Sequence, residues 1–151
     1  MRALKLVGKD LQLGQNGYAE VQGVPKVRQD LVCAILTPYG SDRFHPQWGS
    51  VLNDRIGLPN TSLATQVIAN EVKRVIGNLI TAQTSTLRRY QANGLKSPYT
   101  NDDMIASVQN VQVSSAYNAT SVSATVTTAS SSSILLNTQG GPSGLVGVTS
   151  Q

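Results

Sequence analysis

The stretch that decides the fold runs from Lys26 to Gly57 and reads KVRQDLVCAILTPYGSDRFHPQWGSVLNDRIG. Its first third has apolar residues at helical spacing, which predicts an amphipathic helix buried through Val27, Leu31, Ala34 and Ile35. Pro25 suits the first turn of this helix, because no intrahelical partner exists there for the missing N–H. The helix is expected to end before Pro38, since a residue preceding proline is pushed out of the α region.

The middle of the stretch is a loop whose glycines and prolines restrict its shape. Trp48 lies in it between Arg43 and Arg55, and arginine with tryptophan is the pairing enriched at protein interface hot spots. These three residues are therefore candidates for a partner interface. The same candidate set includes the arginines of the two helices, Arg28, Arg88 and Arg89. The competing interpretation of each arginine is ordinary solvated surface.

A second, longer helix is expected after the loop, with Ser62 as its N-cap. Its apolar face comprises Leu63, Val67, Ile68, Val72, Val75, Ile76, Leu79 and Ile80, while Asn70, Glu71, Lys73, Arg74 and Asn78 are expected to point outward. Gly77 indicates close packing or a bend, because glycine weakens a helix by roughly 1 kcal/mol relative to alanine. Gly94 is the expected stop.

The segments on either side of the helices follow the alternating pattern of strands. The first twenty-odd residues are expected to form short antiparallel strands at the edge of a sheet, with a turn at Asn16-Gly17. Near the other end, apolar residues mark further strands, separated by turns at Tyr117-Asn118 and at 130–133: Ile105, Val108, Val111 and Val113, then Val122, Ala124 and Val126, then Ile134, Leu135 and Leu136. Thr100 and Asp103 are expected to cap a single helical turn before them.

These patterns predict an α+β fold, in which two main helices pack on one face of an antiparallel sheet and the C-terminal part is β-rich. Residues 1–138 are expected to form a single domain. Residues 139–151 read QGGPSGLVGVTSQ, which is typical of a linker. They are expected to form a tail that is flexible or ordered only by a partner.

The charge balance gives little support to nucleic-acid binding. The 12 basic and 8 acidic residues leave a net charge of +4, yet the basic residues are scattered and aromatic residues make up only 5% of the chain. A basic stripe interleaved with aromatic residues, which single-stranded nucleic acid would need, is missing from the sequence. Few charges, at 13%, instead suggest a surface that neighbours cover.

No enzyme motif stands out. Glycoside hydrolysis needs two carboxyl groups across a cleft, and the nearest candidates are Asp102-Asp103 in a turn and Asp42 with Asp54 in the loop beside Trp48. His45 is the only histidine and Cys33 the only cysteine, so a multi-histidine metal site and an internal disulfide are both excluded. Phosphate-binding and dinucleotide-binding glycine motifs do not occur. The expectation is no enzyme activity, no cofactor and no metal, and no membrane-spanning segment.

The order of these pieces resembles the baseplate wedge subunit of contractile phage tails, the GPW or gene-twenty-five-like family, which is related to a type VI secretion baseplate subunit. The resemblance covers roughly residues 3 to 136. It is most specific at Val27–Asp30, Leu36–Gly40, His45-Pro46, Trp48-Gly49 and Ile56-Gly57. The chain departs from the family in lacking the Glu-Pro-Arg triplet that follows the long helix. Its nearest counterpart is Leu87–Tyr90, which lacks the glutamate and the proline.

The resemblance implies a structural protein of the virion, in the tail baseplate and assembled in the bacterial host cytoplasm. Its partners would be other wedge proteins and the tail sheath protein, in a hetero-oligomeric assembly without nucleic acid or membrane. The family also offers a sheet edge to the sheath, which makes Val108, Val111 and Val113 candidates for strand docking. Two alternatives remain open, a tail-associated peptidoglycan hydrolase and a small basic nucleic-acid-binding protein.

Overall fold

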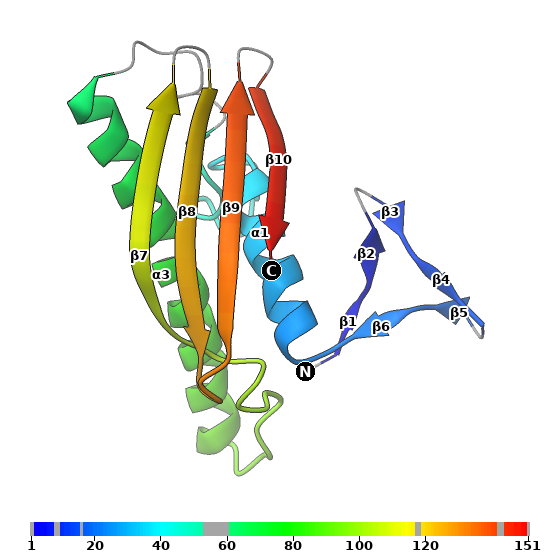
Figure 1. Cartoon of the computed structure of the whole chain (residues 1–151). Coiled ribbons are helices and arrows are strands. Elements are labelled where there is room, and N and C mark those ends of the chain that lie inside the picture. The colour runs from blue at the N-terminus through cyan, green and yellow to red at the C-terminus, as the bar shows by residue number, and fades with distance from the viewer. Residues whose placement is uncertain are drawn as a thin grey trace.

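A computed structural model describes residues 2–7, 10–15, 17–52, 61–116, 119–141 and 144–150. In these described residues, two helices lie on one face of a four-stranded antiparallel sheet, and a separate group of short strands extends to one side (Figure 1). The predicted α+β class is confirmed. No helix in the described part of the chain is long and apolar enough to cross a membrane.

Helix α1 spans Val24–Leu36 and agrees with the prediction in both its ends. Leu36, which the sequence pattern also assigns to the apolar face, is 43% exposed. Pro25 lies in the first turn of the helix, and Thr37 caps its end in an extended conformation just before Pro38. Its buried side chains are Lys26, Val27, Leu31, Ala34 and Ile35. Lys26 is buried despite its charge because it pairs with Asp30 one turn later.

Helix α3 spans Ser62–Ala92 and is the longest element of the molecule. Its N-cap is Thr61 and not Ser62 as predicted, since the Thr61 hydroxyl oxygen accepts a hydrogen bond from the Ala64 amide at 3.1 Å. The helix ends at Ala92, and Gly94 terminates it two residues later with a φ of +65°. The Leu95 amide donates to the Tyr90 carbonyl at 2.9 Å, which is the pairing of a Schellman motif.

The main sheet has the order β10-β9-β8-β7, so each strand pairs with its neighbour in the sequence. Its strands are β7 (Ile105–Ala116), β8 (Ala119–Thr128), β9 (Ser133–Gly141) and β10 (Gly144–Ser150). Helix α3 packs along β7, while α1 packs against α3, β9 and β10 (Figure 1). The predicted strands at residues 105–113, 122–126 and 134–136 are confirmed, whereas the predicted turn at Tyr117-Asn118 lies outside the described residues.

The tail expected at residues 139–151 is part of the sheet wherever the structure describes it. Strand β9 continues to Gly141, and β10 pairs back along it from Gly144 opposite Gly141 to Ser150 opposite Leu136. The linker-like composition was a poor guide here, because backbone hydrogen bonds to a neighbouring strand do not depend on the side chains. The expected domain boundary at residue 138 therefore falls inside β9.

The first residues form an N-terminal arm, defined here as residues 2–21, which pairs only within itself. Its strands are β1 (Ala3–Leu4), β2 (Leu6–Val7), β3 (Asp10–Leu11), β4 (Leu13–Gly14), β5 (Gly17–Tyr18) and β6 (Glu20–Val21). They pair as β1-β6, β2-β3 and β4-β5. The three pairs meet where Lys5, Gln12 and Ala19 bond to one another through their backbones at 2.7–2.9 Å. The prediction that these strands lie at the edge of the sheet is wrong.

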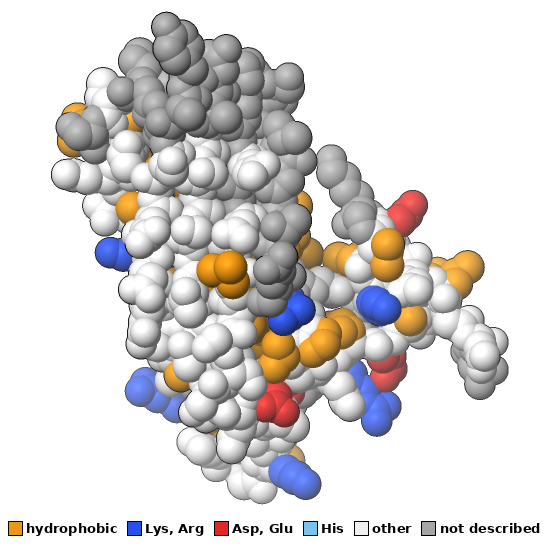
Figure 2. Space-filling model, in the orientation of Figure 1, with side chains coloured by type: hydrophobic (Ala, Val, Ile, Leu, Met, Phe, Trp, Pro, Cys, Tyr) orange, Lys and Arg blue, Asp and Glu red, His pale blue; other side chains and the backbone are white. Residues whose placement is uncertain are grey.

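One side chain of α1 hydrogen-bonds the arm to the body. Gln29 donates to the Leu4 carbonyl and accepts from the Leu6 amide, both at 2.8 Å. Figure 2 shows the arm with apolar side chains on its surface, whereas the outer face of the main sheet carries mostly uncharged polar groups and backbone. Leu13 is 74% exposed and Val7 59%. The arm thus gains little from burial in the isolated chain.

A buried carboxylate joins the beginning of α1 to the beginning of β7. Asp103 is fully buried and accepts hydrogen bonds from the Gly23 amide at 2.7 Å and from the amide and hydroxyl of Thr100 at 3.0 Å. Burial raises the pKa of Asp103, but the hydrogen bonds that it accepts prevail and lower its pKa to about 2. Gln83 of α3 completes this junction by bonding to the Asp103 carbonyl and the Ile105 amide, each at 2.9 Å. The turn predicted at Thr100–Asp103 is therefore present.

Candidate functional site

The loop after α1 is closed at its base by backbone hydrogen bonds between its two ends. The Ser50 amide donates to Thr37 at 2.8 Å, the Tyr39 amide to Ser50 at 3.0 Å, and the Gly40 amide to Trp48 at 3.1 Å. Gly49 permits this close approach, because a Cβ there would lie 2.5 Å from the Pro38 carbonyl oxygen. Its φ of +90° also favours glycine. The loop is therefore fixed by its backbone.

An ion pair on α3 clamps the loop to the helix. The Glu71 carboxylate is buried, pairs with the Arg74 guanidinium at 2.7 Å and accepts from the Val51 amide at 2.9 Å. Arg74 in turn donates to the carbonyls of Gln47 at 3.1 Å and Gly49 at 2.7 Å. The hydrogen bond to Glu71 raises the pKa of Arg74 above its already high ordinary value. Arg74 thus stays charged and holds the loop.

The tip of the loop is organised by Asp42. Its carboxylate accepts from the Phe44 amide at 2.8 Å and from the His45 ring at 3.0 Å. The Phe44 hydrogen bond is the main cause that lowers the pKa of Asp42, followed by the one from His45. The Phe44 side chain itself is 87% exposed. An aromatic side chain is thereby presented to solvent on an ordered turn.

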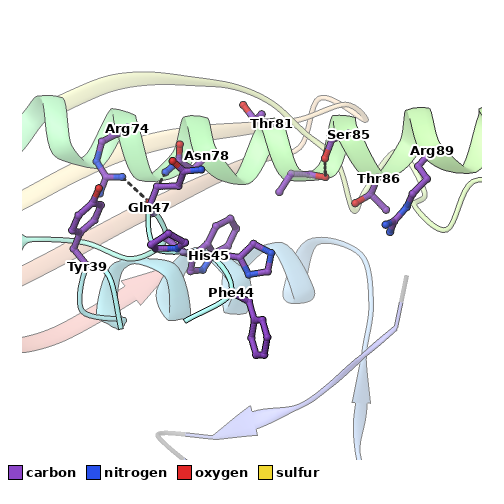
Figure 3. Close-up of a pocket in the computed structure, with 13 residues that line it drawn as sticks. Tyr39, Phe44, His45, Gln47, Arg74, Asn78, Thr81, Ser85, Thr86 and Arg89 are labelled. Atoms are coloured by element: carbon purple, nitrogen blue, oxygen red, sulfur yellow. Dashed lines mark hydrogen bonds between the residues drawn. The ribbon is translucent and has the colours of Figure 1, made fainter. Parts of the chain in front are cut away.

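Between this loop and α3 lies an open groove of about 710 Å³ (Figure 3). Phe44, His45 and Trp48 form its loop side, and in Figure 3 Thr86 and Arg89 point from α3 toward that side. The residues that line it are Tyr39, Phe44, His45, Pro46, Gln47, Trp48, Arg74, Asn78, Thr81, Ala82, Ser85, Thr86 and Arg89. This lining includes cationic, hydroxyl and aromatic groups but no carboxylate.

A smaller cavity of about 290 Å³ lies on the other side of Trp48, between α1 and α3. Trp48, Ala82 and Thr86 line both spaces. Cys33 of α1 faces the smaller one, where burial and then the charge of Asp30 raise the pKa of its thiol. A raised thiol pKa lowers the reactive thiolate fraction, which agrees with Cys33 as a packing residue near the core.

The structure brings together only part of the predicted interface. Arg89 lines the groove, and Trp48 forms one of its walls while packing partly against the hydrophobic core. Arg43 is exposed in the same loop, and Arg88 is exposed beside Arg89 without lining the groove. Arg28 lies half-buried on α1, away from this lining. Arg55 lies outside the described residues.

The three valines predicted for strand docking lie on an edge strand but face inward. Val108, Val111 and Val113 of β7 are half-buried and pack against the core. In the described part of the chain, β7 is bonded to a strand only on its β8 side. An added strand would therefore meet the backbone of β7 and its outward side chains, not these valines.

Two residues essential to the site were not singled out from the sequence. Glu71 and Arg74 were expected to point outward, yet Glu71 is only 9% exposed. Their spacing of three residues on a helix is the signal that could have indicated an ion pair. Nothing in the sequence indicated that the loop would supply carbonyl groups to Arg74.

The described residues give little support for a catalytic carboxylate pair or a metal site. Asp42 is held by its own turn, Asp54 lies outside the description, and Asp103 is buried at a structural junction. No group of three or more histidine, cysteine, aspartate or glutamate side chains in the described ranges is placed to hold a metal ion. The chain matches no protein-family model, no curated protein and no solved structure.

Proposed function

We propose that this chain is a structural subunit of the baseplate wedge of a contractile injection machine, such as a phage tail. In this role it joins wedge scaffold proteins and offers a sheet edge at which sheath assembly begins. It would then be part of the virion tail, assembled in the bacterial cytoplasm. The proposal starts from the resemblance carried by Val27–Asp30, Leu36–Gly40 and Trp48-Gly49, and three features of the fold support it.

The open edge of β7 is the observation that carries the proposal. This strand spans 12 residues, and its described hydrogen-bonded partner is β8 alone. A long edge strand is an aggregation risk for a free protein, and assembly proteins use such edges to accept a strand from a partner. An added strand gains affinity from main-chain hydrogen bonds, so the inward direction of the three valines does not hinder docking.

The N-terminal arm is the second supporting feature. Apolar side chains of this arm are largely exposed, namely Leu4, Val7, Leu11, Leu13 and Tyr18. Several apolar side chains on one small projecting element are typical of a surface that a partner covers. A subunit of a permanent assembly has such a partner.

The loop between α1 and α3, whose shape is fixed, is the third supporting feature. Its stretch carries the most specific part of the resemblance, and its shape is set by Gly49, by backbone bonds and by the Arg74 clamp. Because this loop is already ordered, a partner that binds Phe44 and Arg43 does not have to offset the entropy cost of ordering the loop.

The two alternatives gain no comparable support. A glycosidase needs a pair of carboxyl groups at its cleft, and no carboxylate lines the groove among the described residues. A nucleic-acid binder needs a continuous basic surface, whereas Lys and Arg side chains are separated on the face drawn in Figure 2.

Cryo-electron microscopy of the particle that copurifies with the affinity-tagged chain tests the proposal. We expect the chain in a baseplate, beside wedge proteins, with a strand of the sheath protein paired along β7. Copurification with no partner, and a monomer in solution, would contradict the proposal. A peptidoglycan or nucleic-acid assay on the purified chain would then test the alternatives.

A further inference from the structure

The groove between the loop and α3 has one cation that its surroundings leave uncompensated. Arg74 is paired with Glu71, and His45 is bonded to Asp42. Arg89 is exposed, and no ion pair to it occurs among the described residues. Because no carboxylate is among the described residues that line the groove, the field at this position favours a negatively charged ligand.

The remaining lining offers contacts to a polypeptide. The hydroxyl groups of Thr81 and Ser85 donate to backbone carbonyls of their own helix, both at 2.9 Å, so their lone pairs remain available to accept N–H groups. Trp48 and Phe44 on the opposite side provide apolar surface. Tryptophan and arginine are among the residue types enriched at the hot spots of protein-binding surfaces.

The groove also has a fixed shape before any ligand binds. Gln47 at its wall accepts from both Arg74 and Asn78 of α3 at 3.1 Å, which ties the loop to the helix along the groove. Binding of a ligand therefore carries no entropy cost for ordering this loop. A single charged anchor can then suffice for measurable affinity.

We infer that this groove binds an extended acidic segment of a partner protein. A carboxylate of that segment pairs with the Arg89 guanidinium, and a neighbouring apolar side chain packs against Trp48 and Phe44. The inference goes beyond the proposed assembly role, because it concerns a surface separate from the β7 edge. It also holds whether or not the partner is a baseplate protein.

A peptide carboxylate fits the charge of the groove better than a nucleic acid does. Binding along a phosphate backbone requires several cations in a row, each neutralising one phosphate. Here Arg74 is paired with Glu71 and His45 is bonded to Asp42, which leaves Arg89 as the one cation without an ion pair in the described lining. One carboxylate and one guanidinium form a matched pair.

Selection from a displayed library of random peptides on the immobilised full chain tests the inference. The wild type is compared with Arg89→Ala and with Arg88→Ala, which removes the same charge from the adjacent exposed residue outside the groove. We expect the wild type and Arg88→Ala to enrich peptides that combine Asp or Glu with an apolar residue, and Arg89→Ala not to enrich them. A selected peptide is then synthesised and titrated by calorimetry.

The titration should give an affinity about tenfold weaker for Arg89→Ala than for Arg88→Ala, and a similar loss when the acid of the peptide is replaced by its amide. Equal losses for the two variants would overturn the inference, because they would indicate general attraction to a basic surface. Failure to enrich acidic peptides, or tighter binding of single-stranded RNA at the same groove, would overturn it as well. None of these outcomes depends on whether a sheath strand pairs with β7.

Discussion

Two buried carboxylates, Glu71 and Asp103, connect segments that are distant in the sequence. Glu71 ties the loop to α3 through Arg74 and the Val51 amide, while Asp103 ties the start of α1 to the turn before β7. A buried carboxylate is stable only when hydrogen bonds replace its lost hydration. Each of the two therefore makes the fold depend on its ionised state.

The lowered pKa of Asp103 predicts how stability depends on pH. Because its pKa is about 2 in the folded chain and 3.8 in a reference peptide, the folded state favours the charged form. The contribution, about 2 kcal/mol, is fully present above pH ~4 and is lost as the pH falls through ~2. We expect Asp103→Asn to lower the free energy of unfolding by about that amount at neutral pH, measured by urea denaturation.

Asp102→Asn is the matched control, since Asp102 is the exposed neighbour of Asp103. Its unfolding free energy should stay close to that of the wild type at every pH. The difference between wild type and Asp103→Asn should shrink toward acid pH. A difference that does not change with pH would show that the carboxylate charge is not the cause.

Residue-scale contacts are also where prediction from the sequence reached its limit. If α3 is considered alone, the helical pattern correctly places Glu71 on its outward face. The loop covers that face, and only the folded chain reveals which polar side chains it buries. Trp48 was predicted as an interface residue, but it packs partly against the core, so its substitution should also reduce stability.

Among the elements, the loop between α1 and α3 depends most on a single residue. An alanine Cβ at position 49 would lie 2.5 Å from the Pro38 oxygen and 2.7 Å from the Thr37 oxygen, at a φ of +90°. We expect Gly49→Ala to lower the free energy of unfolding by more than about 1 kcal/mol, because the loop base must open. Thermal or urea unfolding monitored by circular dichroism measures the change.

Gly77→Ala should change the free energy of unfolding in the opposite direction in the same assay. A Cβ at Gly77 would meet no heavy atom within 4 Å, and the residue lies inside α3. This substitution should raise stability by about 0.5–1 kcal/mol, since alanine favours the helix. If both variants moved in the same direction, the steric account of Gly49 would be wrong.

The bulges of strand β7 account for the uneven spacing of its apolar residues in the sequence. Its inward residues, Ile105, Val108, Val111 and Val113, are spaced by three, three and two. The pairing with β8 shifts between Ile105 and Ser107 and again between Gln109 and Gln112, where Asn110 has a φ of +50°. Each bulge absorbs one residue and keeps the valines on the inner face. Apolar spacing alone therefore predicted a strand but not its bulges.

Across the whole molecule, the arm and the body are nearly independent. The buried apolar residues described by the structure begin at Val27, and the Gln29 side chain of α1 hydrogen-bonds to the arm at Leu4 and Leu6. We expect a chain that begins at Gln22 to unfold cooperatively, with a free energy within about 1 kcal/mol of the full chain. It should also bind less of a hydrophobic dye, because the exposed leucines of the arm are gone.

Gln29→Ala in the full chain is the companion variant, which releases the arm without removing it. It should retain the dye binding of the wild type and a similar unfolding midpoint in urea. Loss of cooperative unfolding in the shortened chain would mean that the arm is part of the folding unit, contrary to this expectation.

At this scale the sequence predicted the helices, the C-terminal strands and their packing on one face, because burial of apolar residues determines all three. It predicted short antiparallel strands in the first residues, but not that they pair with one another apart from the main sheet, and it did not predict the strand β10. Both depend on backbone hydrogen bonds between segments such as Gly144–Ser150 and β9, where side chains carry little information. The groove also escaped prediction, since its two walls come from different elements.

Trp48 is the only tryptophan of the chain and lies where the core, the groove and the smaller cavity meet. Its ring is 6.4 Å from that of His45, between ring centres. Tryptophan fluorescence from this protein therefore originates at one known position. A spectral change during unfolding or on addition of a ligand can be assigned to the junction of loop and helices without any introduced label.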